Sequence, residues 1–302
     1  MDITGWATQG IERLKGRRRR GLPGWKGARG GLSLDTLIEY AARLGYGARG
    51  FVYVSVGLLT LAAALDRTGH AVGSRGAAFW LAEQPFGRVW LVALGLGLWA
   101  FVGWRVLQSV FDADREGRTP KALLLRAGQA ASGVFYGLLA AGVFELLDEV
   151  GPKMALEDVE ENRRKAEILL ALPFGDLLLM AAGAVILSVG AGNIIKGFSA
   201  DFGEALVCSD RLCGPLTMVA RAGYIARGFA YMPLALLVVL AGWRASAAAV
   251  GSFGSSLDAL EAQPGGWIML ALTALGLVAF GLFAFVEARF RRIRPPRDYS
   301  PV

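Results

Sequence analysis

The chain has 302 residues, of which 54% are hydrophobic and 19% are charged, and its net charge is +7. A soluble protein of this length carries fewer apolar and more charged residues, and its apolar residues alternate with polar ones instead of forming long blocks. The composition therefore excludes an ordinary soluble domain and predicts an integral membrane protein.

Six blocks without any charged residue predict six transmembrane helices. In chain order they are residues 50–65, 89–104, 127–144, 177–195, 228–243 and 262–286. All six are rich in Leu, Ala, Val and Gly, which suits helices that pack closely in lipid. We therefore expect an all-α integral membrane fold of six transmembrane helices.

The charged residues between these blocks predict the topology. Basic residues concentrate before the first block, after the second block and at the C-terminus, whereas the segment after the third block is acidic. Because basic residues stay on the cytoplasmic side, we expect both termini to be cytoplasmic, as an even number of helices requires. Arg105, Glu145 and Glu287 lie near the ends of blocks and are expected at the membrane interface.

An internal repeat organises the chain. Three windows align without gaps: Arg43–Tyr53, Arg126–Tyr136 and Arg221–Tyr231, of which the first and third are identical at eight of eleven positions. After each window a proline opens the next apolar block, at Pro85, Pro173 and Pro264, where we expect it in the first turn of a helix. Each unit thus has two helices, so the units face the same way and form three parallel helical-hairpin repeats with a pseudo-three-fold arrangement.

These features divide the chain into five segments. They are a basic N-terminal cytoplasmic arm (1–39), the first repeat (40–120), the second repeat (121–215), the third repeat (216–292) and a C-terminal tail (293–302). The second repeat carries a charged insertion at about residues 148–167, which we expect to be an outer loop with a short amphipathic helix.

The window Arg43–Tyr53, the segment Ala82–Gly87 and their copies make the chain resemble a bacterial family known only as domain of unknown function 1206. The resemblance covers about residues 40–290. It implies a protein of the bacterial inner (plasma) membrane with three two-helix units. It implies no activity, because none is assigned to the family.

Several repeated residues share one face of their predicted helices. They are Arg43, Gly50, Tyr53 and Gly57 in the first unit, Arg126, Gly133 and Tyr136 in the second, and Arg221, Gly228 and Tyr231 in the third. Small residues at such spacing let helices approach closely, which predicts a packing seam between the units. The alternative is that the three tyrosines face a shared central cavity.

Arg49 and Arg227 allow a second pair of interpretations. Only 16 uncharged residues separate Arg49 from Asp66, which is about 24 Å of helix against a hydrocarbon core of about 30 Å. Either these side chains snorkel to the interface and anchor the helix, or they bind anionic lipid or solute head groups between the units. Arg43, Arg49, Arg126, Arg221 and Arg227 are therefore the candidate residues for binding lipid or a membrane partner.

The sequence offers no pattern for chemistry. It contains no cluster of metal ligands, no set of nucleophile, base and acid, and no phosphate-binding loop, so we expect no enzymatic activity and no cofactor. Cys208 and Cys213 are expected to be reduced thiols without a metal. The segment Gly45–Gly50 matches G-x-G-x-x-G but enters a membrane helix instead of following a strand, so the match is a coincidence.

The sequence thus predicts a non-enzymatic structural or interaction protein that binds membrane lipids, in particular anionic lipid, or another membrane protein, and no nucleic acid. The alternative is a small-solute or ion transporter or channel with a path along the pseudo-three-fold axis. A dry seam of packed side chains would favour the first interpretation. A cavity lined by Tyr53, Tyr136 and Tyr231 would favour transport.

Overall fold

The computed structural model describes residues 33–65, 73–148, 154–200, 202, 206 and 210–293. The N-terminal arm up to residue 32, the tail from residue 294 and Cys208 lie outside the described residues. The helices are α2 (Leu34–Ala64), α3 (Ser74–Ala82), α4 (Gly87–Val110), α5 (Pro120–Asp148), α6 (Met154–Leu170), α7 (Gly175–Ser199), α9 (Asp210–Trp243), the 3₁₀ turn η1 (Ala247–Ala249), α10 (Phe253–Glu261) and α11 (Gly266–Phe290).

Six of these helices, α2, α4, α5, α7, α9 and α11, are long and apolar enough to span a membrane. The prediction of an all-α, six-helix membrane fold is therefore confirmed. The helices extend beyond the charge-free blocks, however, because α2 begins at Leu34 and α9 at Asp210. As a result, Arg49 and Arg227 lie near the middle of their helices and not at the ends.

The three repeats share one turn at the start of their second helix. Phe86, Phe174 and Gly265 each follow a repeat proline and have left-handed backbones, with φ of 62°, 61° and 72°. The helices α4, α7 and α11 begin at the next residue, which is a glycine in every case. The expectation that the prolines occupy the first helical turn is therefore wrong, since the left-handed residue separates each proline from the helix.

The helices pair in a cyclic order that follows the repeats. The second helix of each unit packs along the first helix of the next, giving the pairs α4–α5, α7–α9 and α11–α2. Within the first and third units, α2 also contacts α4, and α9 contacts α11. This order of contacts is consistent with the pseudo-three-fold arrangement that the repeat predicts.

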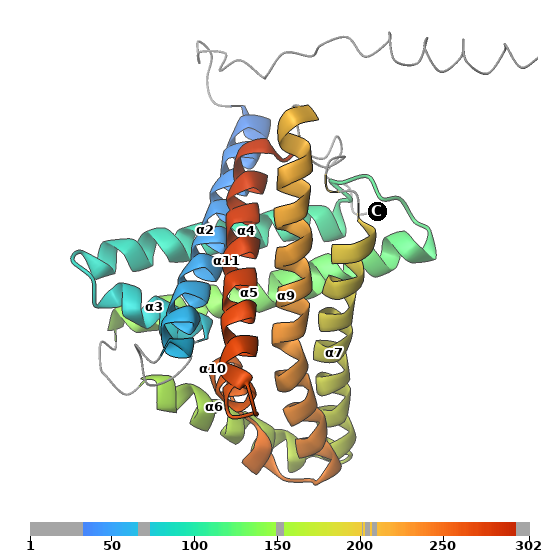
Figure 1. Cartoon of the computed structure of the whole chain (residues 1–302). Coiled ribbons are helices and arrows are strands. Elements are labelled where there is room, and N and C mark those ends of the chain that lie inside the picture. Colours follow the sequence, from blue (N-terminus) through green and yellow to red (C-terminus); the bar gives the residue numbers. More distant parts are fainter. Residues whose placement is uncertain are drawn as a thin grey trace, which may run out of the picture. The chain divides into compact units, whose positions relative to one another are not determined.

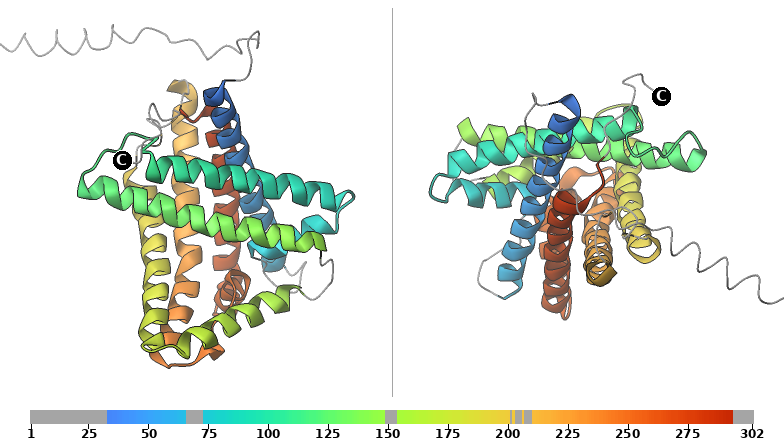
Figure 2. Two further views of the ribbon diagram at one scale, coloured as in Figure 1. Left: turned by 180° about the vertical axis from the view of Figure 1, so that it is seen from behind. Right: turned by 90° about the horizontal axis from the view of Figure 1, so that it is seen from above.

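The second unit departs from this arrangement. No extensive contact joins α5 and α7, although the backbones of both are described in full. In Figures 1 and 2, α2, α11, α9 and α7 lie side by side in this order, and α4 with α5 runs across the row. The charged insertion forms α6, as predicted, and this helix packs against α7 and η1.

Two equivalent glycines explain why the first and third hairpins close. A Cβ atom on Gly45 would lie 2.6 Å from the Phe101 backbone, and one on Gly223 would lie 2.5 Å from Phe280 Cα. Only glycine allows α2 to approach α4, and α9 to approach α11, this closely. The equivalent Gly128 of α5 has no atom within 4 Å of the position its Cβ would take.

These three glycines give a matched test of the arrangement. We expect Gly45→Val and Gly223→Val each to lower the free energy of unfolding by about 1–3 kcal/mol, because the added atoms overpack the helix crossing. We expect Gly128→Val to change it by less than about 0.5 kcal/mol, since the site is open. Thermal unfolding of the purified variants in detergent measures this, and an equal loss in Gly128→Val would show that α5 and α7 are in contact.

Candidate functional site

A cluster of buried charged and aromatic side chains lies where the three repeats meet. At its centre are Phe101 of α4 and Phe280 of α11, which are fully buried and occupy equivalent positions in their repeats. The guanidinium carbon of Arg49 lies 4.5 Å from the centre of the Phe280 ring and 5.5 Å from that of Phe101. Cation–π attraction of this kind is strongest where the cation is desolvated, as Arg49 is at 2% exposure.

Glu287 of α11 holds the network of ion pairs together. Its Oε2 atom lies 3.3 Å from Nη1 of Arg49, and its Oε1 atom lies 2.6 Å from Nη1 of Arg291. Arg291 also pairs with Asp114 at 3.3 Å, and Gln129 of α5 donates to Asp114 at 3.4 Å. The network therefore joins residues of all three repeats.

Arg291 lies just beyond the end of α11. Burial disfavours its charged form, but the neighbouring Tyr46, Glu287 and Asp114 outweigh burial and raise the pKa of Arg291 above its ordinary value. The side chain is therefore charged at every physiological pH. It extends the positive charge of the cluster beyond the last turn of the helix.

Two of the three repeat tyrosines pack on the same rings, and the third meets one of them through its hydroxyl group. The hydroxyl groups of Tyr53 and Tyr231 lie 3.2 Å apart, and Arg227 donates from Nη2 to Tyr231 at 3.3 Å. Tyr53 meets Phe280 edge-on at 4.7 Å between centroids, and Tyr136 meets Phe101 in the same way at 4.9 Å. Tyr53 and Tyr136 thus pack against the two phenylalanines, whereas the Tyr231 ring packs against Phe253 of α10 and its hydroxyl group reaches Tyr53.

The cluster carries more positive than negative charge. Five cationic side chains surround the aromatic rings: Arg49, Arg105, Arg227, Arg291 and Lys196. The described residues that pair with them supply two carboxylates, Glu287 and Asp114. The buried Nε atoms of all four arginines make no hydrogen bond to a described residue. Buried charge without a counter-charge is unfavourable, so the site favours an additional anion.

The other predicted arginines have structural contacts. Arg43 donates to the carbonyls of Ala288 and Arg289 at 2.8 and 3.0 Å. Arg126 donates to the carbonyls of Ser109 and Val110 at 2.8 and 3.0 Å. Each thereby satisfies the last carbonyls of the helix paired with its own, a common use of arginine at helix ends. Arg221 is exposed on α9.

The predicted small residues lie at contacts between neighbouring units. A Cβ atom on Gly50 would lie 2.9 Å from the Gly281 carbonyl oxygen, and one on Gly228 would lie 2.6 Å from that of Gly190. For Gly57 the nearest atom is in Val278, at 2.7 Å, and for Gly133 it is in Arg105, at 3.2 Å. The glycines therefore allow close helix packing between units, while the tyrosines of the same repeats meet in the centre.

Sequence reasoning missed several residues of the cluster. Arg105 and Glu287 were expected at the interface but lie in the cluster, and Glu287 is 3% exposed. Trp104 is also buried and donates to the Tyr46 hydroxyl at 3.2 Å. The signal available was the short charge-free stretch after Arg49, which is compatible with a longer helix that contains a paired arginine.

Metal chemistry finds no support in the part of the chain that the structure describes, where no group of three His, Cys, Asp or Glu residues could hold an ion. Cys213 is disulfide-bonded, so the expectation of a reduced thiol is wrong for this residue.

The repeats match a known family three times, over residues 44–112, 127–200 and 222–291. The chain belongs to the family described as Domain of Unknown Function (DUF1206). It is also 27% identical over 265 residues to the uncharacterized protein YxxB of Bacillus subtilis (strain 168). The aligned region covers 85% of this chain and 92% of that protein. No solved structure matches the chain. The protein is thus a multi-pass membrane protein of a family without an assigned function.

Proposed function

We propose that this DUF1206 protein is a non-enzymatic protein of the bacterial plasma membrane that binds an anionic group in its central cluster. The observation that carries the proposal is the set of four buried arginine Nε atoms without a hydrogen-bond partner among the described residues. Two carboxylates face five cations there. An anion would take up the unused donors and balance the charge.

An anionic lipid head group is the ligand that best suits this position. Arg49 and Arg227 lie within membrane-spanning helices, so a ligand that enters between the units comes from the bilayer. Ionisable residues inside a membrane mark functional sites by default, and basic pockets between helices bind lipid head groups. The phosphate group of such a lipid accepts several hydrogen bonds from arginine, which Nε and Nη atoms can donate together.

Transport of a small solute or ion is the second candidate. The lack of extensive contact between α5 and α7 favours it, because a ring of units that is open at one side can move there. Against transport, Phe101 and Phe280 are fully buried in the centre of the cluster. The hydroxyl groups of Tyr53 and Tyr231 also form a hydrogen bond there. Binding of an anion therefore agrees with the packed centre of the cluster better than conduction of a solute or ion does.

The proposed orientation has both termini in the cytoplasm. It is supported by the basic residues before α2, between α4 and α5, and after α11. The disulfide of Cys213 points the other way, because disulfides are rare in the cytoplasm and this residue lies near the start of α9. The charge pattern involves many residues in three segments, whereas the disulfide concerns one site, so the charges favour cytoplasmic termini.

Lipid binding can be tested on one helix. We expect Arg227→Gln to reduce the anionic phospholipid that remains bound to the purified protein, with about tenfold weaker binding, or roughly 1.4 kcal/mol. Arg221→Gln, which removes the same charge from an exposed position of α9, should leave it unchanged. Native mass spectrometry of both variants measures bound lipid, after size-exclusion chromatography has shown that they are folded. Equal lipid content in the two variants would argue against the cluster as the binding site.

The orientation can be tested with a reporter enzyme that is active only outside the cytoplasm. Fused at Glu160 of α6, it should be active, because this segment follows an odd number of membrane-spanning helices. Fused after Val302, it should be inactive. Activity at Val302 without activity at Glu160 would reverse the proposed orientation and would place Cys213 on the oxidising side.

A further inference from the structure

The second unit leaves open the face of α7 that the other units bury. Counted from the repeat prolines, five equivalent positions of the second helix are 8% exposed or less in the first and third units: Leu94, Leu98, Phe101, Trp104 and Gln108 in α4, and Thr273, Leu277, Phe280, Phe283 and Glu287 in α11. In α7 these positions are Ala182, Ile186, Val189, Gly192 and Lys196, and none of them is buried. We call these five residues the open face of α7.

The open face has also lost bulk. Val189 stands where the other units have a phenylalanine, and Gly192 stands where they have Trp104 and Phe283. No atom lies within 4 Å of the position that a Cβ on Gly192 would take. The same holds for Gly128 of α5, whose equivalents receive the second helix of their own unit. The sides of α5 and α7 that should meet are therefore both without a protein neighbour.

Lys196 places a positive charge at one end of the open face. It occupies the position of Gln108 and Glu287, which are buried in the other units. Its ammonium group lies 4.7 Å from the centre of the Tyr224 ring, and this ring meets Phe280 edge-on at 5.0 Å. The exchange of a carboxylate or an amide for a cation adds to the excess of positive charge in the central cluster. An anionic group beside α7 would balance it.

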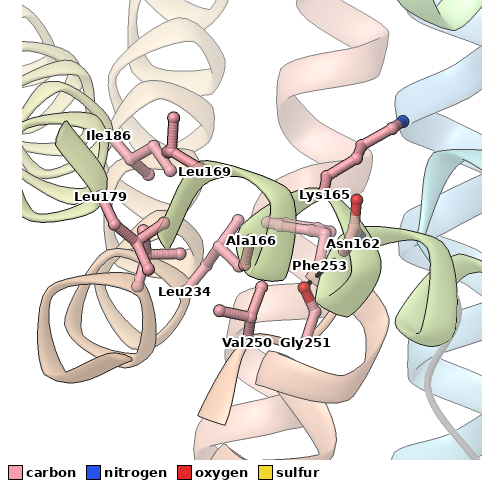
Figure 3. Close-up of a pocket in the computed structure, with 11 residues that line it drawn as sticks. Asn162, Lys165, Ala166, Leu169, Leu179, Ile186, Leu234, Val250, Gly251 and Phe253 are labelled. Carbon is pink, nitrogen blue, oxygen red and sulfur yellow. Dashed lines mark hydrogen bonds between the residues drawn. The ribbon is translucent and has the colours of Figure 1, made fainter. Parts of the chain in front are cut away.

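The remainder of the open face is apolar and has the length of one leaflet. Lys196 lies in the last turn of α7. Ala182 is 14 positions away, or about 21 Å along the helix, against about 15 Å for half of a hydrocarbon core. Ile186, between them, also lines a pocket of about 270 Å³ that α6, α7 and α9 enclose (Figure 3). A phospholipid has the same order, with its charge at the interface and its chains toward the middle of the membrane.

We propose that an anionic phospholipid lies between α5 and α7, with its phosphate at Lys196 and an acyl chain along the open face of α7. This inference rests on the proposed binding of an anionic lipid in the central cluster, and it adds the place of the chain and the side of entry. The charge selects the lipid class. A zwitterionic phospholipid would bring a further cation to a site that already has an excess of them.

Photo-cross-linking of the full-length protein provides the test. The photoreactive residue p-benzoylphenylalanine takes the place of Val189 or, as a control, of the exposed Leu187 on another side of α7. The nanodiscs contain phosphatidylglycerol and phosphatidylcholine in a known ratio. We expect the lipid cross-linked at position 189 to be enriched about fivefold in phosphatidylglycerol, the preference that one basic residue gives an anionic lipid. At position 187 we expect the ratio of the nanodisc.

Two outcomes of this experiment would overturn the proposal. The nanodisc ratio at both positions would show that ordinary bilayer lipid covers the open face. Cross-links from position 189 to α5 or to a second copy of the chain would show that protein closes the second unit.

Two substitutions that restore the bulk of the first unit should exclude the lipid. Val189→Phe and Gly192→Trp supply the side chains that α4 has at Phe101 and Trp104. We expect each to weaken binding of phosphatidylglycerol about tenfold, as a moderate overpacking penalty does, and Leu187→Phe to leave it unchanged. Native mass spectrometry measures the bound lipid after size-exclusion chromatography has shown that the variants are folded. Unchanged lipid in both folded variants would contradict the site.

Lys196→Gln separates this site from the central cluster. We expect it to abolish the enrichment at position 189, because the charge that selects the lipid is gone. Loss of bound lipid in Arg227→Gln with no enrichment at position 189 would leave the cluster as the binding site and reject the place between α5 and α7. If neither Arg227→Gln nor Lys196→Gln changes the bound lipid, the proposed function fails as well.

Discussion

A single buried carboxylate fixes how the repeats are arranged. Glu287 is almost completely buried, and transfer of an isolated carboxylate from water into such a place is strongly unfavourable. It becomes tolerable only because Arg49 and Arg291 both pair with it, one from α2 and one from the end of α11. The first and third units must therefore pack side by side. The ion pair of Arg291 with Asp114 then holds the loop between α4 and α5, which leads to the second unit, against the end of α11.

The same arrangement creates the proposed site. Each repeat alone exposes an arginine, a tyrosine or a phenylalanine that it cannot cover, and the cluster assembles only when the units meet. The Phe101 ring lies beside the guanidinium groups of Arg49 and Arg105, and the Phe280 ring lies beside that of Arg227, so cation–π attraction offsets part of the repulsion among these cations. The remaining excess of positive charge is the property from which anion binding follows. The repeat is thus a means of building a buried cationic site.

Much of the fold could be predicted from the sequence, because charge-free blocks and repeated windows report directly on helices and their order. The repeat also placed Tyr53 and Tyr231 at equivalent positions, where the alternative to a simple packing seam had the repeat tyrosines facing one another. The helix ends and the role of Arg49 could not be predicted, since a rule that lets charges end a helix fails where a charge is paired inside the membrane. Glu287 lies outside the aligned windows, so the repeat did not identify it. The open second hairpin was also hidden, because α5 keeps the glycine, Gly128, while the equivalent of Phe101 and Phe280 in α7 is the exposed Val189.

The most direct test is a double-mutant cycle on Arg49 and Glu287, with the partly exposed pair of Arg43 and Glu39 as a reference. Replacing each residue by Gln, singly and together, and measuring unfolding in detergent gives the coupling free energy of each pair. We predict a coupling of about 1–3 kcal/mol for Arg49 and Glu287, and about 0.5 kcal/mol or less for the reference pair. Additive effects of Arg49→Gln and Glu287→Gln would show that this contact does not hold the repeats together.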